Sequence, residues 1–225
     1  MLVNVYGAKC VGIESVKVTV EVEVVQGIGI HLVGLADTAV KESLLRTVTA
    51  LQALGYHIPG RKIVINLAPA DLRKNGSGYD LPIAIGILAA SGQCVFQAVQ
   101  DYVIMGELGL DGSIRDVPGA LPFADMARTE GFRGCILPLA SALEAVDFRD
   151  LSLFGVSTLA DVVRILSAQD DPSDLLVWNS REYQRSRRAK PSAAVDLNTG
   201  ELLEPGAGAE VDFSDIIGQE GAKRG

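Results

Sequence analysis

The sequence lacks the segments that mark membrane and secreted proteins. It has no run of about eighteen apolar residues, so we expect no transmembrane helix. Met1–Gly7 is not a basic segment leading into an apolar one, so we expect no secretory signal peptide. These absences predict a cytoplasmic protein.

Cysteine and histidine are also scarce. The three cysteines, Cys10, Cys94 and Cys135, are odd in number and widely spaced, which argues against a disulfide framework and fits a reducing compartment. We expect each to be a small buried apolar residue. With only His31 and His57 as histidines, we predict no metal site.

The charge balance argues against a general nucleic-acid binder. The chain has 28 acidic and 20 basic residues, a net charge of −8, whereas phosphate binding needs clustered lysine and arginine. Hydrophobic residues make up 48% of the chain but aromatic residues only 5%. The composition therefore predicts a packed core built mainly from Val, Ile, Leu and Ala.

Periodicity indicates alternating strands and helices up to about residue 167. Alternate positions from Val16 to Val24 are valine, the period of a strand with one buried face. A three- and four-residue spacing of apolar residues predicts a helix over Thr38–Leu54, with Asp37 as N-cap and Gly55 after its end. Asp80–Ala90 is apolar almost all round, which predicts a buried central helix.

The rest of this region continues the alternation. Asp111-Gly112 is a strong hairpin signal between segments 102–110 and 113–117. Further strands are expected at 30–33, 62–67, 134–137 and 152–156, and further helices at 121–130, 141–146 and 159–167. The fold class is therefore α/β (α+β).

The composition changes after residue 167. Residues 168–210 have little periodicity and are predicted to be a linker, partly basic at 181–190, with a short strand or helix possible at 175–178. Residues 211–225 look like the start of a further module.

Three stretches carry a resemblance to a known family. They are GLADTAVKES at 34–43, VINLAPADLRKNGSGYDLPIA at 64–84 and GELGLDGSIRDVPGALP at 106–122. Together they resemble the N-terminal domain of the ComM/YifB family of magnesium-chelatase-like AAA+ ATPases. The resemblance implies a Lon-protease-like domain, of the ribosomal-protein-S5-domain-2-like fold, with helices packed on a mixed sheet over residues 1–167.

The resemblance resumes at residues 212–220, DFSDIIGQE, which are similar to the opening of an AAA+ module. It implies that Ile216, Ile217 and Gly218 lie near adenine in the full protein. The phosphate-binding G-x-x-x-x-G-K-[ST] loop is absent from these 225 residues, so we expect no ATP hydrolysis and no cofactor in this chain.

The family implies more for the full-length protein. It would use ATP and Mg²⁺, form a homo-oligomeric ring, expected to be hexameric, and act on DNA by branch migration during recombination and natural transformation. The partners implied for this chain are its own AAA+ module, other copies of itself and DNA, with no membrane.

Ser77 occupies the position of the Lon-type nucleophile, just before a buried helix. Such peptidases need a lysine as base, and Leu121 stands at the matching position. Since Ser77-Gly-Tyr-Asp80 also has the form of a capping box, we expect Ser77 to cap the helix. No residue is assigned a catalytic role.

Other charged residues near Ser77 have simpler explanations than chemistry. Arg73 and Lys74 could contact a phosphate or the AAA+ module, but a solvated loop is the preferred interpretation. Asp80 would favour the positive end of a helix dipole.

Two further carboxylates, Asp71 and Glu107, also have structural interpretations. Asp71 could begin a turn. Glu107 would need a partner if buried, for which Arg115 across the hairpin is the candidate.

The basic segment leaves two interpretations open. With Trp178 and Tyr183 nearby, it could bind single-stranded DNA by charge and stacking, or it could be a solvated linker. The candidate DNA-binding residues are Arg181, Arg185, Arg187, Arg188 and Lys190.

The sequence is therefore consistent with three functions. The first is a non-catalytic domain of a DNA-directed AAA+ ATPase. The alternatives are a Lon-like serine peptidase using Ser77 and a subunit of a magnesium-chelatase-type ATPase.

Overall fold

The computed structural model describes residues 1–167, 171–189, 194–195 and 202–203. The alternating valines form strand β2 (Glu14–Val25), whose residues Val18, Val20 and Val22 are fully buried. Strand β1 (Leu2–Val11) pairs antiparallel with β2 along its whole length, from Leu2↔Glu23 to Val11↔Glu14.

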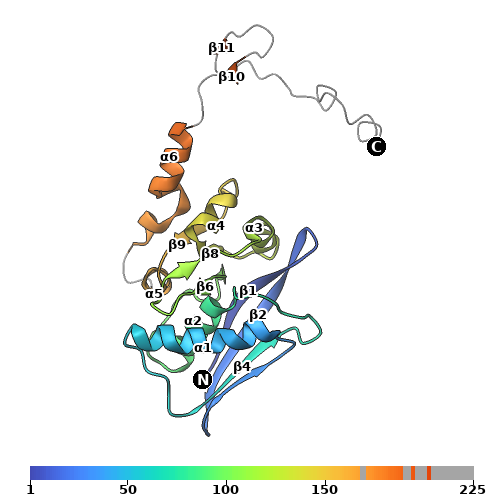
Figure 1. Ribbon diagram of the computed structural model, residues 1–225, viewed down its shortest axis with the longest axis vertical. Helices are drawn as coiled ribbons and strands as arrows, with labels where there is room; N and C mark the ends of the chain where they lie inside the picture. The colour runs from blue at the N-terminus through green and yellow to red at the C-terminus, as the bar shows by residue number, and fades with distance from the viewer. Residues whose placement is uncertain (168–170, 190–193, 196–201, 204–225) are drawn as a thin grey trace. The chain divides into compact units, whose positions relative to one another are not determined.

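The hairpin formed by β1 and β2 is the centre of a seven-stranded sheet, in the order β3-β4-β2-β1-β5-β8-β9 (Figure 1). Strand β2 is antiparallel to both of its neighbours, whereas β3–β4, β1–β5, β5–β8 and β8–β9 are parallel pairs. The predicted mixed sheet is therefore confirmed. The added strands are β3 (Ile30–Val33), β4 (Lys62–Ala68), β5 (Tyr102–Ile104), β8 (Gly134–Pro138) and β9 (Ser152–Val156).

Two helices form the apolar layer over the β1–β2 hairpin. Helix α1 (Thr38–Ala53) packs on α2 (Asp80–Ala90), and α2 packs on β1 and β2. The Asp37 side chain accepts a hydrogen bond from the Val40 N–H at 2.9 Å, so the predicted N-cap is confirmed. All residues of α2 are buried, as its uniform apolar composition predicts.

The remaining helices of the first 167 residues also contact the main sheet. Helix α3 (Ala120–Thr129) contacts β2 and β8, α4 (Leu139–Glu144) contacts β8 and β9, and α5 (Leu159–Ser167) contacts β9. None of the helices in the described part of the chain is long and apolar enough to cross a membrane.

The sequence predicts a single strand over residues 102–110, but the structure divides this segment. Strand β5 ends at Ile104, and β6 (Glu107–Leu108) pairs instead with β7 (Ile114–Arg115) in a separate two-stranded hairpin. Between them, the Gly106 N–H donates to the Gly78 carbonyl at 2.9 Å and the Gly106 carbonyl accepts from the Leu81 N–H at 3.0 Å. These bonds to the start of α2 turn the chain out of the main sheet.

The boundary predicted at residue 167 is too early. A first compact unit runs from Met1 to Gln184 and a second from Arg185 to Gly225. Within the first, Trp178 Nε1 donates to the Val146 carbonyl at 3.0 Å and Arg149 donates to the Tyr183 hydroxyl at 2.8 Å. Residues 171–184, assigned to a linker from their composition, therefore pack on the first unit.

Short elements occupy this C-terminal part. They are the 3-10 turns η1 (Ser173–Leu175) and η2 (Val177–Asn179), helix α6 (Arg181–Ala189), and the paired strands β10 (Ala194–Val195) and β11 (Leu202–Leu203). Most of residues 190–225, including the predicted AAA+ start at 211–225, lie outside the described residues.

The contact between α2 and the sheet predicts a severe effect of substituting Gly86. A Cβ there would lie 2.4 Å from Val22 Cγ2, and Val22 is buried and stiff about χ1. We expect Gly86→Val to lower the free energy of unfolding by about 2–3 kcal/mol, measured by urea denaturation.

The matched control is Gly60→Val, since a Cβ at Gly60 meets nothing within 4 Å. It should change the free energy of unfolding by less than about 0.5 kcal/mol. Equal effects of the two substitutions would contradict the close packing of α2 on β2.

Candidate functional site

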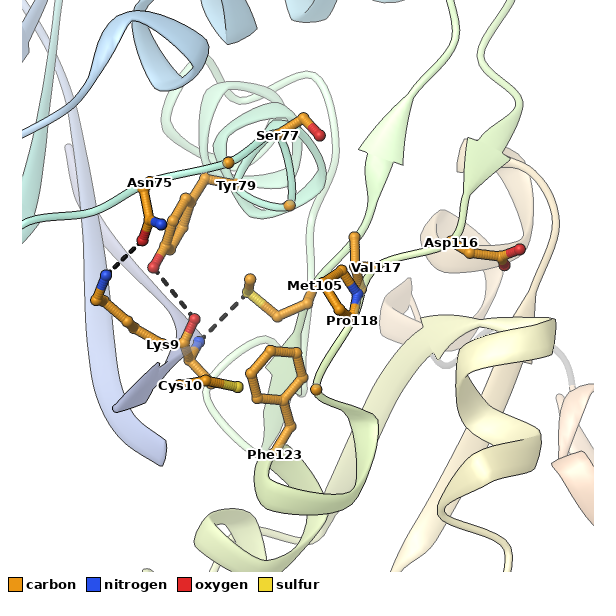
Figure 2. Close-up of a pocket in the computed structure, with 14 residues that line it drawn as sticks. Lys9, Cys10, Asn75, Ser77, Tyr79, Met105, Asp116, Val117, Pro118 and Phe123 are labelled. Carbon is orange, nitrogen blue, oxygen red and sulfur yellow. Dashed lines mark hydrogen bonds between the residues drawn. The ribbon is translucent and has the colours of Figure 1, made fainter. Parts of the chain in front are cut away.

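A cavity of about 330 Å³ lies between β1, the loop before α2 and the loop before α3 (Figure 2). The three stretches of sequence that carry the family resemblance do not include its β1 wall. The cavity is therefore assembled by tertiary contacts. Its lining residues are Ala8, Lys9, Cys10, Asn75, Gly76, Ser77, Gly78, Tyr79, Met105, Asp116, Val117, Pro118, Gly119 and Phe123.

The walls of the cavity are mainly apolar. Tyr79, Met105 and Phe123 are almost fully buried and face the cavity from three different elements (Figure 2). The Tyr79 hydroxyl donates to the Ala8 carbonyl at 3.2 Å, and the Ala8 N–H donates to Met105 Sδ at 3.3 Å. Burial raises the pKa of the Tyr79 phenol, so this hydroxyl stays protonated and can donate at neutral pH.

Ser77 bonds to a carboxylate and not to a base of the Lon type. Its hydroxyl donates to Glu107 Oε2 on β6, and Glu107 Oε1 lies 3.3 Å from the guanidinium of Arg115 on β7. The predicted pairing of Glu107 with Arg115 is confirmed, in the hairpin register Glu107↔Arg115. The pair is partly exposed, with Arg115 at 65% and Glu107 at 24% side-chain exposure, so its contribution to stability is small.

The predicted capping box at Ser77 is wrong. The N-cap of α2 is Tyr79, with no side-chain capping bond, and the Asp80 N–H donates to the Ser77 carbonyl at 3.1 Å. The hydroxyl is directed to the β6–β7 hairpin because Glu107 offers a charged acceptor there. Sequence spacing cannot reveal this acceptor, which is 30 residues away.

Leu121 is half-exposed on the first turn of α3 and does not line the cavity. Among the described residues, no lysine or histidine hydrogen-bonds to the Ser77 hydroxyl. The arrangement can orient Ser77, but it supplies no amine to take up its proton.

Lys74 corrects the expectation of a solvated loop. Its side chain is fully buried and donates to the Pro69 carbonyl, and burial lowers the pKa of its ammonium. Its backbone bonds to Leu35 at 2.8 Å and to Asp37 at 3.1 Å, which ties the loop before α2 to the loop before α1. Arg73 is exposed, as expected.

Asp80 does more than favour a helix dipole. It is fully buried, and its carboxylate accepts from Arg46 Nε at 2.7 Å, from Arg46 Nη2 at 3.1 Å and from the Leu108 N–H at 3.1 Å. Burial raises the pKa of Asp80, and the bonds from Arg46 and Leu108 oppose that rise. Arg46 lies 34 residues before Asp80 and on a different helix, so no local pattern in the sequence identifies it as the partner.

The cysteines do not share one environment. Cys135 is buried and Cys94 is half-buried, whereas Cys10 is exposed at the cavity rim. The expectation of three buried cysteines is therefore wrong for Cys10, which lies close to the end of β1 where the sheet gives less cover.

Comparison of the sequence with known proteins shows the family of this chain. Residues 20–141, more than half of the chain, match the family described as "Subunit ChlI of Mg-chelatase". The chain is 36% identical over 222 residues to the uncharacterised protein YifB of Escherichia coli, covering 98% of this chain and 39% of that protein. It is 35% identical over 224 residues to the competence protein ComM of Haemophilus influenzae, covering 99% of this chain and 40% of that protein.

The chain belongs to the YifB/ComM family of magnesium-chelatase-like proteins. It spans about two fifths of the length of these relatives.

The YifB/ComM chain also has a more distant peptidase relative. It is 21% identical over 141 residues to an archaeal Lon protease of Methanocaldococcus jannaschii, covering 63% of this chain and 21% of that protein. This similarity agrees with the mixed α/β architecture of the chain.

The basic segment of this YifB/ComM chain is helical at its start. Arg181 and Arg185 are exposed and lie one turn apart on α6. Arg187 and Arg188 fall on the same helix. Lys190, like Ile216, Ile217 and Gly218, lies outside the described residues. Within the described ranges, no three His, Cys, Asp or Glu side chains gather to hold a metal ion.

The buried Asp80 predicts a pH-dependent loss of stability on removal of Arg46. Arg46→Ala leaves a buried carboxylate without its cation, and we expect the free energy of unfolding at pH 7 to fall by about 3 kcal/mol. Burial already raises the pKa of Asp80 in the folded protein, and removal of Arg46 would raise it further. As the pH falls, the folded variant therefore takes up a proton on Asp80 at a higher pH than the unfolded chain does, and this uptake favours the folded state. The loss should therefore shrink as the pH falls towards the ordinary pKa of aspartate.

Urea denaturation at pH 7 and pH 5 measures this effect. Arg128→Ala is the control, since Arg128 pairs with Asp125 at the surface, where both side chains are more than half exposed. A loss for Arg46→Ala that is independent of pH would show that Asp80 is not the group responsible.

The bond from Ser77 to Glu107 predicts a structural effect of Ser77→Ala. Loss of a hydrogen bond to a charged acceptor should lower the free energy of unfolding by about 1–2 kcal/mol, measured by urea denaturation. Glu107→Gln keeps an acceptor for Ser77 and should have a smaller effect. If Ser77→Ala leaves stability unchanged, this bond does not hold the loop to the hairpin.

Proposed function

We propose that this chain is a non-catalytic N-terminal domain of an AAA+ ATPase that acts on DNA, in branch migration during recombination and natural transformation. ATP hydrolysis, with its Mg²⁺, resides in the part of the longer relatives that this chain does not span. The domain works in the cytoplasm, contacts its own AAA+ module and other copies of itself in a ring, expected to be hexameric, and helps to engage DNA.

The non-catalytic role is supported by the hydrogen-bond partner of Ser77. A serine is activated by a base that takes its proton, and here the hydroxyl donates to a carboxylate that is itself paired with Arg115. Leu121, which the family resemblance places at the position of the peptidase lysine, does not line the cavity. These contacts support the interpretation of Ser77 as a link between the loop and the β6–β7 hairpin.

The observation that supports contact with DNA is the basic helix. Arg181 and Arg185 lie one turn apart on α6. Tyr183, between them in the sequence, is buried, and its hydroxyl accepts a hydrogen bond from Arg149. The exposed guanidinium groups of Arg181 and Arg185 support contact with phosphates.

A second candidate rests on the family description. The match to "Subunit ChlI of Mg-chelatase" favours a chelatase-type complex as an alternative role. Failure to bind DNA would favour this alternative or a purely oligomeric role for the domain.

The test is a titration of this chain into fluorescently labelled single-stranded DNA and a four-way junction, followed by anisotropy at two salt concentrations. We expect salt-sensitive binding that is lost when Arg185, Arg187 and Arg188 become Ala. For single strands, the slope of log affinity against log salt should fall by up to about 2, at about 0.7 for each lost phosphate contact.

The matched control removes the same charge elsewhere, with the exposed residues Lys41, Arg61 and Arg133 changed to Ala. It should bind DNA much as the unchanged protein does. Equal losses in both variants would indicate non-specific charge effects, and an absence of binding would contradict a DNA contact by this domain.

The peptidase alternative has its own measurement. A fluorophosphonate probe should leave Ser77 unlabelled, and casein should remain intact with the domain. Labelling of Ser77 that disappears in Ser77→Ala would overturn the non-catalytic role.

A further inference from the structure

A second cavity, of about 280 Å³, lies at the start of the parallel strands β5, β8 and β9, and shares no lining residue with the cavity beside Ser77. One wall comes from these strands and another from Ile165 on α5. The third comes from Pro172 and Leu176, in the segment that packs on the first unit although its composition predicted a linker. The second cavity therefore exists only because this segment folds against the sheet.

The floor of the second cavity is formed by two aromatic rings. The strand register places Tyr102 beside Gly134 and Gly134 beside Ser152. Because Gly134 has no side chain, the Tyr102 ring can cross β8 and meet the Phe154 ring on β9. The two ring centroids are 5.7 Å apart and the rings meet edge to face, at 71°.

The Tyr102 hydroxyl is a buried polar group with nothing to bind. The residue is only 4% exposed, yet its hydroxyl forms no hydrogen bond with any group in the part of the chain that the structure describes. Burial raises the pKa of the Tyr102 phenol, so the hydroxyl is protonated at neutral pH and can donate. Leaving a buried hydroxyl unpaired is unfavourable, and an acceptor on a ligand would satisfy it.

A guanidinium group lies beside this hydroxyl. The centre of the Arg133 guanidinium is 6.0 Å from the centroid of the Tyr102 ring. Its nearest carboxylate, on Asp101, is 3.9 Å away, which is beyond hydrogen-bond distance, and 65% of the Arg133 side chain is exposed. The N–H fork of Arg133 is therefore open to a ligand, and such forks match the two oxygens of a carboxylate.

The acidic group that lines the second cavity is already paired. Asp171 Oδ1 accepts from the Ser173 N–H at 3.0 Å, and Asp171 Oδ2 accepts from the Ser173 hydroxyl at 2.9 Å. The groups still open at the second cavity are thus a guanidinium and the hydroxyl of Tyr102, which together favour an anionic acceptor.

The remaining surface of the second cavity suits a compact apolar group. Phe154, Ile165 and Leu176 supply aromatic and aliphatic walls. The volume of about 280 Å³ lies near the lower end of ligand-binding sites and corresponds to about ten non-hydrogen atoms, at about 30 Å³ for each water-sized unit. A free small molecule therefore fits this space better than a folded partner does.

We propose that the second cavity binds a small monocarboxylate with a compact apolar body. The carboxylate accepts from the Tyr102 hydroxyl and the Arg133 guanidinium, and the apolar body lies between Phe154, Ile165 and Leu176. This binding depends neither on the role of Ser77 nor on the DNA contact, and its test can fail without affecting either.

The test is a titration of the ¹⁵N-labelled 225-residue chain with phenylacetate, followed by the shifts of its amide signals. We expect a dissociation constant on the order of 1 mM, with shifts at Tyr102, Ser152 and Phe154. Phenylacetamide has the same shape without the charge and should bind at least about fivefold more weakly. Acetate has the charge without the apolar body and should bind at least about tenfold more weakly.

Two variants identify the groups that hold the carboxylate. Arg133→Gln should weaken binding of phenylacetate about fivefold and leave phenylacetamide unchanged, because only the acid uses the charge. Tyr102→Phe should weaken both probes about three- to fivefold, because both place an oxygen at the hydroxyl. Since this hydroxyl is unpaired in the free protein, Tyr102→Phe should be as stable to urea as the unchanged chain.

The matched control is Arg128→Gln, which removes an exposed arginine that does not line the second cavity. It should bind all three probes as the unchanged chain does. The proposal is overturned if phenylacetate does not bind up to about 20 mM, if phenylacetate and acetate bind equally, or if Arg133→Gln weakens the acid and the amide alike. Amide shifts confined to residues around Ser77 would also overturn it. If Tyr102→Phe proves unstable, the exposed Arg133→Gln variant still decides the question.

Discussion

The buried pair of Arg46 and Asp80 holds together the elements from which the candidate site is built. Asp80 opens α2, Arg46 lies on α1, and the Asp80 carboxylate also accepts from the backbone of Leu108 on β6. A fully buried carboxylate is unfavourable unless it is bonded and neutralised. This cluster therefore helps to fix the position of the β6–β7 hairpin relative to α2, together with the backbone bonds of Gly106, and with it the contact between Glu107 and Ser77.

The same constraint explains why a peptidase-like position can persist without peptidase chemistry. The loop before α2 is fixed at one end by Asp80 and at the other by Lys74, whose buried side chain and backbone bond to neighbouring loops. Ser77 lies between these anchors and donates to Glu107. Its hydroxyl thus contributes to holding two loops together, a role that requires a hydrogen-bond acceptor but no base.

The β1 wall of the cavity has a different origin from its Ser77 wall. Strand β1 extends past β5, so in the described part of the chain its last residues have a neighbouring strand on one side only, and on the other side the side chains of Tyr79 and Met105 contact Ala8. The cavity is what remains between this uncovered edge and the loop before α3.

Local pattern in the sequence determined the elements whose cause is local. The valine alternation of β2, the apolar composition of α2, the Asp37 cap and the Asp111-Gly112 hairpin all follow from neighbours within a few residues, and the structure confirms each of them. The long match at 64–84 fixed the family for the same reason, since it is a continuous stretch. Only the tertiary structure decided the partner of Ser77, the burial of Lys74, the pairing of Asp80 with Arg46, the split of segment 102–110 and the packing of residues 171–184. Each of these depends on which groups are brought together across tens of residues, and a buried charge or hydroxyl takes whichever partner the fold places beside it.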